Sequence, residues 1–201
     1  MKKLFALLLI SIMAFAVVSC DKGAQQQQPT AEQQQFEDFT HAVNQTPAAQ
    51  IKVVTEFTTE LGVLGSTIDT RFNPDGSATI NYSIENFDSD FVGAAPVITK
   101  TGTVTLNKDG SYSDGGEFEG LIGSSVSSVL INLDSTKFES YNIDGGTLSA
   151  VVKAENTEAV FGTAIAADVN FMLTISNDRV ISVVLNYKVA AGTVETVISY
   201  S

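Results

Sequence analysis

The side chains that could carry acid–base or nucleophilic chemistry are few in this chain. There is one histidine, His41, so any Ser-His triad and any histidine-based metal site would depend on it. His41 lies in a segment whose pattern predicts a helix, and we expect it to be a solvated surface residue. Serines are abundant, but none lies in the Gly-x-Ser-x-Gly elbow of acylating enzymes, and Gly123-Ser124-Ser125 lacks the second glycine.

Two groups of carboxylates have spacings that cation binding or acid catalysis could use. Asp88-Ser89-Asp90 matches the start of a calcium loop, but the twelfth position holds Thr99 in place of the bidentate glutamate. Glu117 and Glu119 are spaced to share one face of a predicted strand, which glycoside hydrolysis could use only beside a substrate cleft. We expect solvated charges in both places, and therefore no metal site and no catalytic residue.

The composition excludes further classes of protein. One cysteine cannot form an internal disulfide, and one cysteine with one histidine cannot build a zinc cage. The 11 Lys and Arg residues against 23 Asp and Glu give a net charge of -12, which would repel the phosphates of a nucleic acid. We expect no nucleic-acid partner, no cofactor and no enzyme activity.

The N-terminus has the parts of a secretory signal peptide. Lys2 and Lys3 form a basic start, and an apolar run interrupted only by Ser11 follows over residues 4–18. This run is shorter than the roughly 20 residues that a membrane-spanning helix needs. Residues 1–19 are therefore predicted to direct export and to be removed.

The end of this segment, Val17-Val18-Ser19-Cys20, resembles the lipobox of bacterial lipoproteins. The resemblance implies that the thiol of Cys20 receives a diacylglyceryl group, that the chain is cut before Cys20, and that the new N-terminus is acylated, for example with palmitate. Such a protein would be anchored in the cell envelope, at the outer membrane or the cell surface. Asp21 resembles an inner-membrane retention signal and leaves the choice of membrane open. The alternative is an ordinary cleaved signal with an incidental cysteine.

The remaining chain divides at a change of composition. Residues 20–35 are rich in glutamine and hold almost no apolar side chain, so they are predicted to form a flexible tether. Residues 36–201 are predicted to form a single β-rich domain with an N-terminal helix. Phe36, Phe39 and Val43 fall on one helical face and indicate a helix near residues 31–45.

Apolar and polar residues alternate along most of the domain, which indicates antiparallel strands with one buried and one solvated face. Asn73-Pro74-Asp75-Gly76 and Asn107-Lys108-Asp109-Gly110 have the composition of hairpin turns with a left-handed glycine. An apolar stripe at helical spacing predicts a second short helix near residues 120–133. The predicted strands cover residues 51–61, 67–72, 77–87, 97–106, 111–118, 137–143, 146–155, 163–176, 180–189 and 193–201.

The predicted fold class is mainly β: an antiparallel meander of about ten strands with two short helices. A sheet of that size must curl, close or split into two layers. A barrel and a strongly curved sheet are favoured by the long strands and tight turns, and a sandwich is the third architecture that fits.

Two functions from different classes remain open. The protein is either a non-catalytic envelope lipoprotein that binds a macromolecule or has a structural role, or a carrier of an apolar or lipid ligand inside a curved sheet. A core filled by Phe57, Phe72, Phe171 and a helix over residues 121–133 would favour the first. A dry cavity of about 300 Å³ or more would favour the second. An enzyme ranks third, because an inventory dominated by carboxylates allows few mechanisms.

Overall fold

The structure of the chain is a computed structural model that describes residues 30–45, 48–87, 97–122 and 131–201. The described part contains nine strands in one antiparallel sheet, three α-helices and two short 3-10 turns. The strands are β1 (Gln50–Thr59), β2 (Gly62–Phe72), β3 (Ala78–Phe87), β4 (Val97–Leu106), β5 (Phe138–Asp144), β6 (Thr147–Val152), β7 (Val169–Ser176), β8 (Arg179–Val189) and β9 (Gly192–Tyr200). The helices are α1 (Ala31–Gln45), α2 (Glu117–Ile122) and α3 (Thr157–Phe161), and the 3-10 turns are η1 (Ser135–Lys137) and η2 (Ala154–Asn156).

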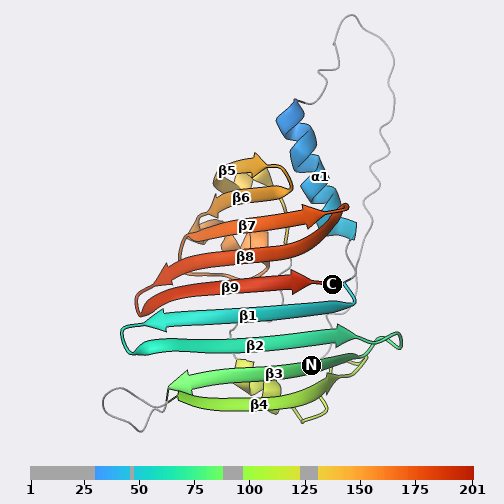
Figure 1. The fold of residues 1–201 in the computed structure, drawn as a ribbon, viewed down its shortest axis with the longest axis vertical. Helices are drawn as coiled ribbons and strands as arrows, with labels where there is room; N and C mark the ends of the chain where they lie inside the picture. The colour runs from blue at the N-terminus through green and yellow to red at the C-terminus, as the bar shows by residue number, and fades with distance from the viewer. Residues whose placement is uncertain (1–29, 46–47, 88–96, 123–130) are drawn as a thin grey trace, which may run out of the picture.

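The sheet consists of two meanders that meet in its middle. The strand order is β4-β3-β2-β1-β9-β8-β7-β6-β5, so the first strand of the sheet pairs with the last. The two edge strands, β4 and β5, do not pair with one another (Figure 1). The prediction of a curved antiparallel sheet is confirmed, and the closed-barrel alternative is wrong.

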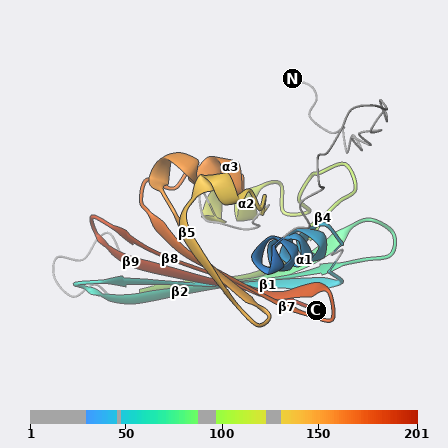
Figure 2. The same cartoon turned by 90° about the horizontal axis from the view of Figure 1, so that it is seen from above.

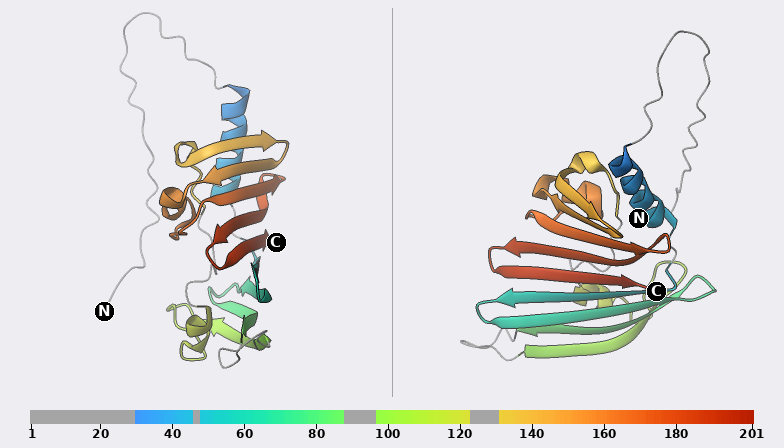
Figure 3. Two further views of the ribbon diagram at one scale, coloured as in Figure 1. Left: turned by 90° about the vertical axis from the view of Figure 1, so that its left-hand side faces the viewer. Right: turned by 45° about the horizontal axis from the view of Figure 1, so that its top comes forward.

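All three helices lie on one face of the sheet, which we call the inner face, and the opposite face is the outer face (Figure 2). The two oblique views in Figure 3 show the same arrangement of helices on a bent sheet. Period-two alternation assigns side chains to the two faces. In β7, Val169, Phe171 and Leu173 are buried under the helices, whereas Asn170 and Met172 are exposed on the outer face.

Two aromatic clusters lie at opposite ends of the inner face. One contains Tyr82, Tyr112 and Phe118, with ring centroids 5.0 Å apart for Tyr82–Phe118 and 5.5 Å apart for Tyr112–Phe118. The other packs around Phe171 and is built from five rings: Phe36, Phe138, Tyr141, Phe161 and Phe171. The helices therefore cover the sheet mainly through aromatic contacts, each worth about 0.5–1.5 kcal/mol beyond its buried area.

Helix α1 begins with a reciprocal cap. The backbone N–H of Gln33 donates to Thr30 Oγ1 at 3.2 Å, and the N–H of Thr30 donates to Gln33 Oε1 at 2.8 Å. The helix predicted near residues 31–45 is confirmed as Ala31–Gln45. Residues 31–35, which the composition assigned to the tether, form its first turns because this cap satisfies N–H groups that a disordered segment would leave to water.

The strand predicted over residues 111–118 is wrong. After the turn ending at Gly110, only Tyr112 makes an isolated bridge, to Leu106. Gly115 and Gly116 have φ values of 75° and 96°, and the carboxylate of Asp114 accepts hydrogen bonds from the N–H groups of Gly116 and Phe118. These bonds turn the chain into α2, so Glu117 and Glu119 lie on a helix and not on a strand face.

Three other details differ from the expectation. The helix predicted near residues 120–133 is present only as α2 up to Ile122, while residues 123–130 lie outside the described residues and Asn132 donates its N–H to the carbonyl of Val160. The first residues of the strand predicted at 163–176 are not in a strand, because Gly162 at φ 69° ends α3 and β7 begins at Val169. Of the phenylalanines considered as core fillers, Phe171 is buried, whereas Phe72 is 49% exposed at the end of β2.

Candidate binding groove on the outer face

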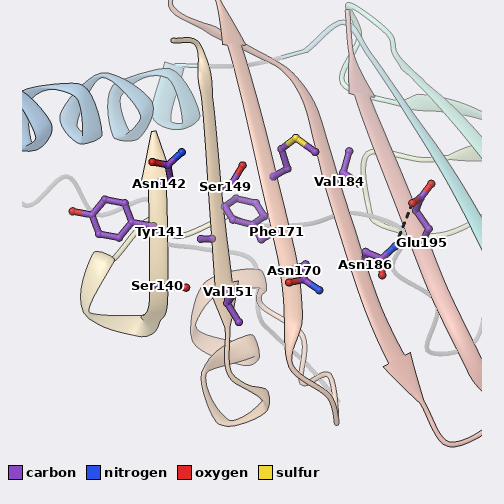
Figure 4. Close-up of a pocket in the computed structure, with 12 residues that line it drawn as sticks. Ser140, Tyr141, Asn142, Ser149, Val151, Asn170, Phe171, Val184, Asn186 and Glu195 are labelled. Atoms are coloured by element: carbon purple, nitrogen blue, oxygen red, sulfur yellow. Dashed lines mark hydrogen bonds between the residues drawn. The ribbon is translucent and has the colours of Figure 1, made fainter. Parts of the chain in front are cut away.

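The outer face of strands β5 to β9 is hollowed into an open groove of about 570 Å³ (Figure 4). Its lining comes from all five strands, which follow one another along residues 138–200. The lining residues are Ser140, Tyr141, Asn142, Ser149, Ala150, Val151, Asn170, Phe171, Met172, Val184, Asn186 and Glu195.

The register of the sheet brings the polar side chains of the groove into one row. Asn170 of β7 is the cross-strand partner of Asn186 of β8, and Asn186 is in turn the partner of Glu195 of β9. The side-chain amide of Asn186 donates to Glu195 Oε2 at 3.3 Å, as the dashed line in Figure 4 shows. Direct cross-strand neighbours have Cβ atoms about 4.5–5.5 Å apart. The spacing of the side chains in this row is therefore close to the length of a sugar ring or of one peptide residue.

A second row, one pleat along the strands, is half polar and half apolar. Asn142, Ser149, Met172 and Val184 are successive cross-strand neighbours on β5, β6, β7 and β8. Met172 is 41% exposed in this row. The groove thus places an apolar surface beside hydrogen-bonding groups.

The lining offers amide, hydroxyl and carboxylate groups, which can form hydrogen bonds with a ligand, and none of its residues is a histidine, cysteine or lysine. Glu195 is the only charged residue in it. Among the residues that the structure describes, no group of three His, Cys, Asp or Glu side chains is placed to hold a metal ion.

The outer face continues past Glu195 into a smaller hollow of about 210 Å³ over β1, β2 and β3. Glu195 is the cross-strand partner of Glu56, which lines this second hollow. Beyond it the N–H of Gly65 donates to Glu85 Oε2 at 2.7 Å. The side of the groove toward β1 is therefore acidic, and the side toward β5 is neutral.

The residues singled out in the sequence do not meet in this groove. His41 is exposed on α1, on the other face of the sheet, and Glu117 and Glu119 lie on α2. Cys20, Asp88-Ser89-Asp90 and Gly123-Ser124-Ser125 lie outside the described residues.

The groove residues were missed because their signal is spread over five strands. Asn142, Asn170 and Asn186 each stand at an outward-facing position of an alternating strand, which looks unremarkable when the strands are read singly. Only the register shows that Asn170 stands opposite Asn186 in one row and that Asn142 lies in the neighbouring row.

No helix in the described parts of the chain is long and apolar enough to cross a membrane.

Comparison with known proteins gives only distant likenesses. No family model and no curated protein sequence matches the chain. Among solved structures, LprF from Mycobacterium bovis is similar over 83% of this chain and 91% of its own, with 12% sequence identity and a TM-score of 0.40. A DUF1329 family protein from Desulfovibrio piger is similar over 84% of this chain and 90% of its own, with 10% identity and a TM-score of 0.23. At these scores neither likeness bears on function.

Proposed function

We propose that the chain is a lipid-anchored, non-catalytic protein of the bacterial cell envelope whose β-rich domain binds a macromolecule through the outer-face groove. The anchor rests on the sequence, because the only cysteine of the chain stands at the position that the lipobox pattern requires. Two acyl chains at one residue would hold the protein stably on a membrane, since each buried CH₂ contributes about 0.8 kcal/mol.

The observation that carries the binding role is the set of amides in the groove, with Asn170 and Asn186 paired in one row and Asn142 in the neighbouring row. Asn142, Asn170 and Asn186 can each donate and accept hydrogen bonds, and Ser140 and Ser149 add hydroxyls that do the same. Side chains that both donate and accept hydrogen bonds are best matched by a ligand whose groups also do both. Hydroxyl and secondary amide groups have this property. The open shape suits a chain laid across the strands better than a small molecule that needs enclosure.

The charge of the lining further restricts the class of ligand that could bind. Glu195 stands opposite Glu56, and like charges directly opposite on a sheet repel one another. An anionic polymer would add to this repulsion, a neutral one would not, and a cationic one would relieve it. The ligand class that fits is therefore an uncharged or amine-bearing polymer of hydroxyl and amide groups, such as the glycan and peptide of a cell wall.

The test uses purified cell-wall sacculi as the probe and the chain from residue 21 onward, which keeps every described core residue. We expect this protein to sediment with sacculi, and the double variant Asn170→Ala, Asn186→Ala to lose at least tenfold in affinity. Thr79→Ala, also on the outer face but on β3 and away from the groove, is the matched control. Equal sedimentation of all three proteins, or none by the unaltered chain, would contradict the proposal.

A carrier of an apolar ligand is the second candidate, and one feature of the inner face favours it. Between the two aromatic clusters, the middle of this face carries the small side chains of Thr55, Ser66 and Thr196. Thr55 Oγ1 and Thr196 Oγ1 are hydrogen-bonded at 3.1 Å. Side chains of this size would let a lipid tail lie close to the sheet if the helices moved aside. Native mass spectrometry of the chain purified from cells would show a stoichiometric lipid if this role is correct.

A further inference from the structure

Strand β4 ends the sheet on one side with backbone groups turned outward. The N–H of Thr105 donates to Ser113 Oγ at 2.9 Å, and the N–H of Ser113 donates to the carbonyl of Thr105 at 2.9 Å. Thr105 therefore directs its N–H and carbonyl away from β3. Alternate residues of an antiparallel strand direct these groups to the same side, so Thr99, Thr101 and Thr103 present theirs along the edge as well.

This edge has few of the devices that usually keep sheet edges apart. Residues 97–106 contain no proline, aspartate or glutamate, their pairing with β3 runs without a bulge, and Lys100 is their one charged side chain. The other edge is protected in the ordinary way. The register of β5 shifts after Phe138, and Lys153 forms ion pairs with Glu139 at 3.0 Å and Asp168 at 2.9 Å beside that strand.

The net charge of the chain bears on where two copies could meet. Two copies with a net charge of -12 repel one another over most of their surface. Strand β4 carries Lys100 as its only charged residue, so two copies can approach here without bringing carboxylates of their edge strands together.

We propose that β4 is a self-association edge, at which a second copy of this chain pairs its own β4 antiparallel about a two-fold axis through Thr101. Thr101 then lies opposite Thr101 of the second copy, and Thr99 lies opposite Thr103 of the second copy. Three residue pairs with outward groups make about six inter-copy hydrogen bonds, because each such pair exchanges two. The two outer faces join, and their threonine side chains form cross-strand pairs of a kind that sheets favour.

The positions of Lys100 and Gly102 favour this register of the two β4 strands. About this axis, Lys100 stands opposite Gly102 of the second copy, where no side chain competes for space. A Cβ on Gly102 would lie 2.5 Å from Tyr82 Oη, so the tyrosine ring already covers the glycine. The stem and ammonium group of Lys100 would therefore meet the Tyr82 ring of the second copy, a contact that attracts a cation.

Neighbouring registers are less favourable. An axis through Lys100 sets the two lysines directly opposite one another, and like charges in that position destabilise a sheet. An axis through Gly102 would require Thr99 to pair with Thr105, whose backbone groups Ser113 already occupies. The axis through Thr101 avoids both conflicts.

Cysteine cross-linking tests the register on the chain from residue 21 onward, which has no native thiol. We expect Thr101→Cys to give a disulfide-linked dimer on mild oxidation, because paired residues have Cα atoms about 5.5 Å apart. Thr99→Cys is the matched control, since its two copies would stand four residues apart, about 13 Å. Adding Thr103→Cys to it should restore the cross-link. Equal cross-linking of the two single variants, or none by either, would overturn the proposal.

Sedimentation of the unaltered chain gives an independent readout. We expect a reversible dimer that strengthens as salt rises, because salt screens the repulsion between two acidic copies. Thr101→Pro removes the central N–H and should give a monomer with an unchanged melting temperature, since an edge strand tolerates proline where its N–H faces outward. Ser199→Lys, on the outer face of the central strand β9, should still dimerise. A monomer at every concentration and salt, or a dimer that persists in folded Thr101→Pro, would overturn the proposal.

Discussion

Cys20 is the only cysteine of the chain, and it follows an apolar segment that is too short to span a membrane. Nothing in the described domain depends on it, because the buried core extends from Phe39 to Ile198. The residue should therefore determine where the protein is, and not whether it folds.

Replacing this thiol separates location from folding. We expect Cys20→Ser to remove the acyl chains and to shift the protein from the detergent phase to the aqueous phase, while its far-ultraviolet circular dichroism stays that of a β-rich domain. Mass spectrometry of the unaltered protein should find Cys20 as the acylated first residue. An unmodified Cys20, or a mature chain that begins elsewhere, would contradict the lipid anchor.

Single residues show where sequence reasoning stops. The outward position of Asn170 follows from the alternation along its strand, and the structure confirms it. Its pairing with Asn186 depends on how β7 and β8 are aligned, and a shift of one residue would move every side chain of a strand to the other face. The composition of the groove is thus visible in the sequence, but its assembly is not.

At the scale of elements, the two turns Asn73–Ser77 and Asn107–Ser111 are built alike. In each, an aspartate Oδ1 accepts hydrogen bonds from the hydroxyl and the N–H of the serine two residues on. The glycine between them has a φ of 87° in the first turn and 83° in the second, as the sequence predicted. The serine hydroxyl bond, followed by the backbone bond, lowers the pKa of Asp75 and of Asp109 below the ordinary 3.8.

These lowered pKa values predict how the free energy of unfolding changes at acidic pH. A carboxylate whose folded pKa lies below its unfolded value of 3.8 stabilises the fold above that pH, and the contribution is lost as the pH falls through the folded pKa. We expect Asp75→Asn with Asp109→Asn to flatten the fall of the unfolding free energy below about pH 4. Urea titrations across that range measure it. Asp38→Asn, on α1, is the control, and an identical fall in all three proteins would argue against the turn bonds.

The elements that the sequence predicted well are those with a clear period and a cap. Helix α1 has an apolar face and a Thr30–Gln33 cap. The alternating strands were found in the right places, although β2 begins five residues earlier and β7 six residues later than predicted. The prediction was wrong where a side chain redirects the backbone. Asp114 turns residues 114–118 into the start of α2, and no alternation of apolar residues reveals such a bond.

For the molecule as a whole, stability depends on the cluster around Phe171, since the open sheet has no second sheet to cover it. Phe171 is 2% exposed and contacts Phe138 and Phe161, with centroid distances of 6.2 and 5.5 Å. This cluster joins β5, β7 and α3 into one unit. At the other end of the inner face, the smaller cluster of Tyr82, Tyr112 and Phe118 packs under α2.

Truncating this ring should therefore be costly. We expect Phe171→Ala to lower the unfolding free energy by about 3–5 kcal/mol, the usual range for a buried phenylalanine. Met172→Ala, one residue on but on the outer face, should change it by about 0.5 kcal/mol or less. Urea denaturation of both variants gives the comparison, and similar losses would mean that the cluster is not the main support of the fold.

The pairing of β1 with β9 also bears on the order in which the sheet can form. Thr55 and Thr196 are 141 positions apart, yet their hydroxyls are bonded in the centre of the sheet. During synthesis, the meander of β1 to β4 emerges long before β9, the strand that joins it to the other half. Contacts so distant in sequence slow folding, because the chain between them must be ordered first. We therefore expect the docking of β9 on β1 to be a late step of folding, with β1 as an unpaired edge until then.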